Sequence, residues 1–160
     1  MVDLAATLEQ FQDALFKGLI APTHCVLRPN LSMLHDDADG VSRLTYAQIV
    51  DGEVQALVAF ITVECYNGLP CLNVGLAVAP AHRRKGLGTR ILNDALCELE
   101  SFLAQGGVEK YYIEGVASIH NDPSNAICRR VFTDSPTRIV CQHSAEDAFQ
   151  YVKLYPNDKA

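Results

Sequence analysis

One turn of this chain concentrates basic residues in a pattern suited to binding an anion. Arg83, Arg84, Lys85 and Arg90 lie close together, and no acidic residue occurs over residues 75–91. The whole chain carries a formal net charge of -6. The local excess of positive charge is therefore a property of this segment, and it indicates a binding function.

The same turn contains Gly86 and Gly88 at the predicted start of a long helix. The first N–H groups of a helix are unpaired and carry partial positive charge, and glycine lets an anion approach them closely. We therefore predict a pyrophosphate site. A P-loop is disfavoured because Lys85 precedes Gly86, and a dinucleotide motif is disfavoured because Ile91 stands at its third glycine position.

Composition and length narrow the class of protein. A chain of 160 residues with 49% hydrophobic and 20% charged residues is typical of one soluble globular domain. No run approaches the roughly 20 apolar residues of a membrane span, and the N-terminus does not resemble a secretory signal. We expect a cytoplasmic protein with no membrane partner. Its negative charge argues against a nucleic-acid surface, and its scattered cysteines predict no metal site.

The first predicted element of the chain is a helix over residues 3–17. Leu4, Leu8, Phe11 and Leu15 recur at helical spacing, and Gly18 follows as a cap. Residues 21–40 are irregular. We expect a short strand over residues 25–28 there, and an acidic turn over residues 36–40 that could attract a cationic amine.

Stronger signals follow from residue 43. Turns at residues 51–52 and 67–68 separate three predicted antiparallel strands, at residues 44–50, 54–65 and 71–78. A helix over residues 86–105 and a strand over residues 110–116 then form a crossover, which predicts that the strands before and after the helix are parallel. A helix begins near Asn121, and residues 137–141 and 149–154 are expected to form a closing hairpin.

These features together resemble the GNAT superfamily of N-acetyltransferases. The segment Arg83-Arg-Lys-Gly86-Leu-Gly88 matches the pattern Arg/Gln-x-x-Gly-x-Gly/Ala at a strand end, and Asn121-x-x-Ser124 follows later in the chain. The resemblance extends from about Leu44 to Phe132. It implies an α/β (α+β) fold, with a mixed, mainly antiparallel central sheet flanked by helices on both faces. We expect one domain over residues 1–160: a divergent helical and substrate region (1–42), a cofactor-binding core (43–132) and a C-terminal hairpin (133–160).

The resemblance implies acetyl-CoA as cosubstrate and assigns its binding residues. Backbone groups of Leu76, Ala77 and Val78 would pair with the pantetheine arm, and Asn121 would hydrogen-bond the same arm. The pyrophosphate would lie among Arg84, Lys85, Gly86, Leu87, Gly88 and Thr89. Candidates for the 3′-phosphate are Arg83, Arg90, Arg129 and Arg130.

The resemblance also implies catalytic residues. Glu114 interrupts an apolar strand at a position similar to that of the general base in protein N-terminal acetyltransferases; Glu64 and His120 are alternatives. Cys128 stands where relatives commonly carry a tyrosine that protonates the departing thiolate. A thiol, with an ordinary pKa of about 8.5, could donate that proton. A buried cysteine without a catalytic role is the other interpretation.

The function implied is acetyl transfer to a primary amine by direct attack on the thioester. The partner would be a small-molecule amine or a peptide amine, and a homodimer is left open. The alternatives are a protein N-terminal acetyltransferase of the ribosomal-protein type, a non-catalytic acyl-CoA sensor, and a structural domain whose basic turn binds another phosphate ligand.

Overall fold

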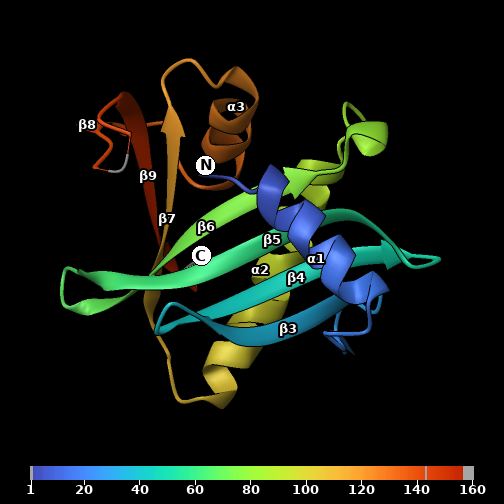
Figure 1. Ribbon diagram of the computed structural model, residues 1–160. Coiled ribbons are helices and arrows are strands. Elements are labelled where there is room, and N and C mark those ends of the chain that lie inside the picture. The colour runs from blue at the N-terminus through green and yellow to red at the C-terminus, as the bar shows by residue number, and fades with distance from the viewer. Residues whose placement is uncertain (1, 143, 157–160) are drawn as a thin grey trace.

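The computed structural model describes residues 2–142 and 144–156 (Figure 1). Its helical elements are α1 (Ala5–Phe16), the short 3-10 helix η1 (Pro80–His82), α2 (Leu87–Gln105) and α3 (Asp122–Val131). Its strands are β1 (Val2–Asp3), β2 (Thr23–His24), β3 (Leu31–Ala38), β4 (Val41–Val50), β5 (Glu53–Tyr66), β6 (Leu69–Val78), β7 (Tyr111–Ser118), β8 (Thr137–Val140) and β9 (Asp147–Tyr155).

The strands form one mixed sheet in the order β2-β3-β4-β5-β6-β7-β9-β8, and β1 pairs with β6 outside this path. Neighbours are antiparallel from β2 through β6 and again over β7, β9 and β8. The pair β6–β7 is parallel because α2 connects the two strands. The predicted sheet and closing hairpin are therefore confirmed.

Helices cover both faces of the sheet, as predicted (Figure 1). On one face, α2 and α3 pack on a core that includes Tyr46, Phe60 and Ile113. On the other face, α1 packs on β5 and β6 through a smaller apolar cluster that includes Leu8 and Leu57. Because side chains alternate along a strand, each strand position belongs to one of these two faces.

The region before residue 43 differs from the sequence-based expectation. Residues 25–28 form no strand; β2 ends at His24, and the long strand β3 extends through Asp36 and Asp37, which were expected in a turn. Pairing with β4 explains the difference. Asp36 stands opposite Arg43, whose guanidinium Nη2 lies 2.6 Å from the Asp36 carboxylate and balances its charge within the sheet.

Two negative findings concern only the described residues. None of their helices is both long and apolar enough to cross a lipid bilayer. Within residues 2–142 and 144–156, no group of three or more His, Cys, Asp or Glu side chains is arranged to hold a metal ion.

Candidate active site

The basic turn ends in a left-handed glycine that starts α2. Gly86 is the residue before the helix, with φ of 73°, and Arg84 also has a positive φ, of 61°. The first hydrogen bond of the helix runs from Arg90 N to Gly86 O, at 3.2 Å. No side chain among the described residues caps this end, so the N–H groups of the first turn are directed out of the helix. These are the donors that an anion requires.

Gly88 allows this end of α2 to approach the sheet closely. A Cβ atom there would lie 3.3 Å from side-chain carbons of both Ile127 and Leu76, and 3.6 Å from Val78. The start of α2 is therefore held between the end of β6 and helix α3. The glycine predicted to bind an anion also has a packing role.

The basic side chains surround the turn from the solvent side. The Arg83 side chain donates from Nε to the carbonyl of Val78 at 3.0 Å, and Lys85 donates from Nζ to Ala81 O at 3.3 Å. Arg84 and Arg90 are exposed. Four cationic side chains thus lie on the segment that precedes and opens α2.

Strands β6 and β7 diverge below this turn. They pair only at Cys71 with Tyr112, Leu72 with Ile113, and Asn73 with Glu114; the described register contains no further β6–β7 pair. Both strands nevertheless continue, to Val78 and Ser118. A parallel pair that opens in this way leaves main-chain groups along the inner edge of β6 available to another partner.

In this structure, that partner is the N-terminal segment of the chain itself. β1 pairs with β6 in parallel, with Val2 opposite Gly75 and Asp3 opposite Leu76. The N–H of Leu4 donates to Leu76 O at 3.4 Å, and a Cβ on Gly75 would lie only 2.8 Å from the Leu4 side chain. Figure 1 shows the N-terminus near the gap between β6 and β7. β1 therefore uses the edge of β6 that was predicted to bind the pantetheine arm.

Glu114 lies at the last paired position before the divergence. Its Oε1 accepts a hydrogen bond from Asn73 Nδ2 at 2.8 Å, and its Oε2 accepts one from Gln150 Nε2 at 2.7 Å. The three side chains come from β6, β7 and β9 and lie on the face of the sheet opposite to α2. Two amide donors hold the carboxylate in place, and Glu114 is half-buried. Among the described residues, no Lys, Arg or His side chain forms an ion pair with it. Such a group can accept a proton.

Asn73 and Gln150 were not predicted from the sequence. A usable signal existed for Asn73, because it is the polar residue inside the apolar segment 71–78. Gln150 becomes a neighbour only through the pairing of β7 with β9, in which Glu114 stands opposite Val152.

Cys128 lies on the other side of β7 from Glu114. Its side chain is fully buried in the core beneath α2 and α3, and a Cβ on Gly115 would lie 3.2 Å from its Sγ. Burial raises the pKa of the Cys128 thiol, which makes it a weaker acid. The backbone of β7 separates the two predicted catalytic side chains.

Asn121 caps α3, and its neighbour Asn125 links three elements. Asn121 Oδ1 accepts a hydrogen bond from Ser124 N at 3.1 Å, which is the role of an N-cap. Asn125 is buried; its Nδ2 donates to Ser118 O and Asn121 O, each at 2.9 Å, and its Oδ1 accepts from Tyr151 OH at 2.8 Å. This network, which was not predicted from the sequence, joins β7, α3 and β9 beside the divergence.

The remaining residues predicted from the sequence to act in catalysis or phosphate binding lie away from Glu114. Glu64 is exposed on β5, within an irregularity of its pairing with β6, and His120 is exposed after β7. Arg130 is exposed, and the Arg129 guanidinium carbon lies 5.8 Å from the centre of the Phe149 ring. None of these residues has a recorded contact with Glu114 in the described part of the chain.

Comparison with known proteins places this geometry in a family. A family model described as "Acetyltransferase (GNAT) domain" matches residues 44–133. No curated protein matches the sequence. Among solved structures, the ribosomal-protein-S5-alanine acetyltransferase of Vibrio fischeri is similar, with a TM-score of 0.52 and 12% identity over 75% of this chain and 64% of that one.

Two further structures have TM-scores of 0.51 and 14% identity. One is a chimera of spermidine N-acetyltransferase from Vibrio cholerae and hSSAT, matched over 70% of this chain and 69% of that one. The other is the NatC complex bound to Gag peptide and CoA, matched over 68% and 69%. The chain thus spans about two thirds of the length of these structures. Because the family model covers more than half of the 160 residues, the chain belongs to the GNAT acetyltransferase domain family.

Proposed function

We propose that this protein is an acetyl-CoA-dependent N-acetyltransferase that acetylates a primary amine. The observation that carries the proposal is the arrangement at the divergence of β6 and β7. There, Glu114 is fixed between Asn73 and Gln150, and the open start of α2 lies at the far end of β6.

The residues at the start of α2 fit the pyrophosphate of acetyl-CoA. Leu87, Gly88 and Thr89 would donate main-chain N–H groups, the left-handed Gly86 keeps the approach free of a side chain, and Lys85 adds positive charge. When bound, acetyl-CoA supplies an activated acetyl group as a thioester. The similar NatC complex is bound to CoA, which supports the same class of ligand here.

The inner edge of β6 fits the pantetheine arm only after a rearrangement. The main-chain groups of Leu76 that face β7 are those that pair with β1, and one edge of a strand serves one partner at a time. We therefore expect β1 to leave β6 when acetyl-CoA binds. Binding then includes the free energy needed to release the N-terminal strand.

Glu114 would act as the general base in the transfer. The acceptor arrives as an ammonium ion, Glu114 removes a proton through a water molecule, and the neutral amine nitrogen attacks the acetyl carbonyl carbon. The C–N bond forms, the C–S bond breaks, and the sulfur leaves with the proton that the attacking nitrogen loses as the amide forms. The N–H of Leu76, once free of β1, would donate to the carbonyl oxygen as negative charge develops. Asn73 and Gln150 position the carboxylate.

The acceptor is proposed at the level of a primary amine. Among the similar structures, one is a ribosomal-protein-alanine acetyltransferase, one is a spermidine acetyltransferase chimera, and one is bound to a peptide. A peptide amine and a small-molecule amine are therefore both compatible with the fold. A small-molecule amine is our first choice, and a protein N-terminus is the alternative. A panel of amines and peptides, with release of free CoA as the readout, distinguishes them.

Replacement of Glu114 by glutamine tests the proposal. We expect Glu114→Gln to lower kcat by about 10²- to 10⁴-fold at neutral pH, the range typical of a lost general base, with an unchanged Kd for CoA. Glu109→Gln is the matched control, because Glu109 is exposed just before β7. Turnover within threefold of the native value in Glu114→Gln would exclude Glu114 as the base.

A second function is favoured by the environment of Cys128. The position at which relatives carry a tyrosine holds a buried thiol with a raised pKa, which is a poor proton donor. A non-catalytic acyl-CoA sensor would need no such donor. Stabilisation by acetyl-CoA with no CoA release on any amine of the panel would favour the sensor over the enzyme.

A further inference from the structure

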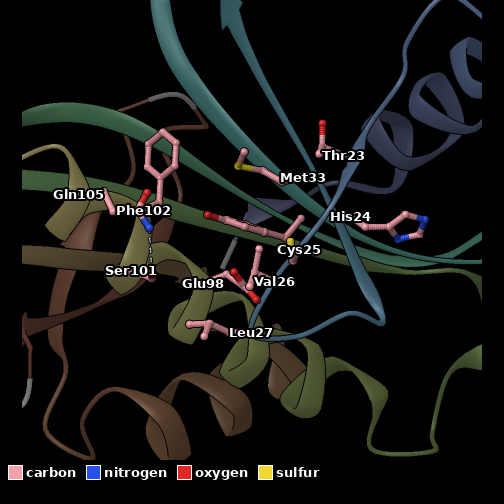
Figure 2. A pocket seen from close by; sticks show the side chains of 11 residues that line it. Thr23, His24, Cys25, Val26, Leu27, Met33, Glu98, Ser101, Phe102 and Gln105 are labelled. Carbon is pink, nitrogen blue, oxygen red and sulfur yellow. Dashed lines mark hydrogen bonds between the residues drawn. The ribbon is translucent and has the colours of Figure 1, made fainter.

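A pocket lies on the face of the sheet that α2 covers, away from the candidate active site. Figure 2 shows it between the segment 23–27, strand β3 and the C-terminal half of α2. Its volume is about 390 Å³. Its lining is mostly apolar and includes Val26, Met33 and Phe102. Figure 2 shows Cys25, Val26 and Glu98 close together at its centre, while the ring of His24 points away from them.

This pocket is separate from the candidate active site. Its helical residues run from Glu98 to Gln105, 11 to 18 positions after Leu87, the first residue of α2. At about 1.5 Å per residue, they lie about 16 to 27 Å along the helix from the predicted pyrophosphate site. Glu114 faces the opposite side of the sheet, so the backbone of the sheet stands between the two sites.

Glu98 places a carboxylate inside this apolar pocket. Glu98 as a whole residue is only 8% exposed. One oxygen accepts a hydrogen bond from the main-chain N–H of Arg28, and the other has no recorded partner among the described residues. None of the described residues that line the pocket is Lys or Arg, and the Arg28 side chain is engaged by Asp94 at 3.0 Å. This second oxygen is not among the fully buried unpaired atoms of the described residues, so it is accessible from the pocket. A negative charge that faces an apolar pocket favours a cationic ligand over a neutral or anionic one.

Tyr46 supplies a second, independent sign of a missing partner. It lines the same pocket and is 1% exposed, and its hydroxyl makes no hydrogen bond within the described residues. A buried hydroxyl without a partner destabilises the folded state. The thiol of Cys25 does not supply a charge, because burial and, secondarily, Glu98 raise its pKa to about 11.

We propose that this pocket binds a small organic ammonium ion with an apolar body. The ammonium group would donate hydrogen bonds to the free oxygen of Glu98 and to the Tyr46 hydroxyl. The apolar body would pack against Val26, Met33 and Phe102. The ligand is distinct from the acetyl acceptor, because the site lies across the sheet from Glu114 and far from the start of α2.

A matched series of probes tests this site: hexylamine, hexanol and hexanoate, titrated calorimetrically at pH 7. We expect hexylamine, as its ammonium ion, to bind at least tenfold more tightly than hexanol, and hexanoate to be excluded by Glu98. Backbone NMR signals of Ser101 and Phe102 should shift, while those of residues 86–89 should not. Equal affinity for hexanol and hexylamine, or shifts confined to residues 86–89 and 114, would overturn the proposal.

Two variants distinguish a loss of ligand binding from a loss of overall stability. Glu98→Gln should weaken hexylamine binding at least tenfold, and Tyr46→Phe about threefold or more, while Glu100→Gln, an exposed change on the same helix, should leave it unchanged. Tyr46→Phe removes an unpaired hydroxyl, so its melting temperature should be equal or higher. If Glu98→Gln fails to fold, Tyr46→Phe decides: native affinity in that folded variant would contradict the site.

Discussion

Weakening strand β1 should strengthen the binding of CoA. In the proposed function, CoA would compete with β1 for the edge of β6 where Asp3 stands opposite Leu76 and the Leu4 N–H donates to Leu76 O. Replacing Val2 and Asp3 by glycine raises the entropy cost of ordering this strand and leaves Leu4 in place to pack on the sheet. The double variant should therefore release β1 more readily.

The size of the effect follows from the pairing. Glycine costs about 0.5–1 kcal/mol per residue inside a strand relative to alanine, so the two substitutions cost about 1–2 kcal/mol. A net main-chain hydrogen bond contributes about 1 kcal/mol, and this short strand can make only a few, so the substitutions remove most of its stability. At about 1.4 kcal/mol per tenfold change, the Kd for CoA should fall about 5- to 30-fold.

Calorimetry and hydrogen exchange measure this directly. In the native chain, CoA should speed exchange of the Leu4 amide and slow exchange of the Leu76 amide. Glycines at the exposed loop positions Asp134 and Ser135 provide the control and should leave the Kd unchanged. Competition between β1 and CoA is refuted if the β1 variant binds CoA with the native Kd, or if CoA binds while the Leu4 amide keeps its protection.

Other outcomes follow from the packing around the divergence. Gly88→Val should lower CoA affinity at least tenfold in calorimetry and destabilise the fold by about 1–3 kcal/mol, because the valine side chain would overfill the contact with Leu76 and Ile127. Gly88→Ala should have much smaller effects on both quantities, and effects as large as those of Gly88→Val would contradict this explanation. Cys128→Ala should keep kcat within about twofold, because the raised pKa makes the native thiol a weak acid; a loss above tenfold with CoA binding intact would assign it the acid role. Tyr151→Phe should lower the unfolding free energy in urea by about 1–3 kcal/mol, since it leaves a buried oxygen of Asn125 unpaired; unchanged stability would count against the network.

The sequence predicted the elements whose signals are local. Residues 71–105 carry an apolar strand, a glycine-bearing turn and a helical period in succession, and the structure has β6, η1 and α2 there. Asn67 and Gly68 both have positive φ, as their hairpin signal predicted. Such patterns depend on neighbouring residues alone, so one sequence is enough to recognise them.

What the sequence could not reveal depends on pairing between distant segments. β3 was missed because Asp36 and Asp37 resemble turn residues until Arg43 is placed opposite Asp36. β1 has only two residues, too few for any periodic signal, yet it occupies the edge of β6. Gln150 reaches Glu114 only through the register of β9. The sequence therefore predicted which residues belong to the candidate site, but not the side chains and strands that contact them.

The proposed function requires the start of α2 and the inner edge of β6 to bind acetyl-CoA. A calorimetric titration with acetyl-CoA and with 3′,5′-ADP, combined with hydrogen exchange of the amides at residues 76 and 86–89, tests it most directly. We expect saturable binding of acetyl-CoA, at least about tenfold tighter than that of 3′,5′-ADP, which lacks the pantetheine arm and has one 5′-phosphate in place of the pyrophosphate. Exchange should slow at both places. No heat of binding at millimolar acetyl-CoA, or binding that leaves these amides unchanged, would contradict it.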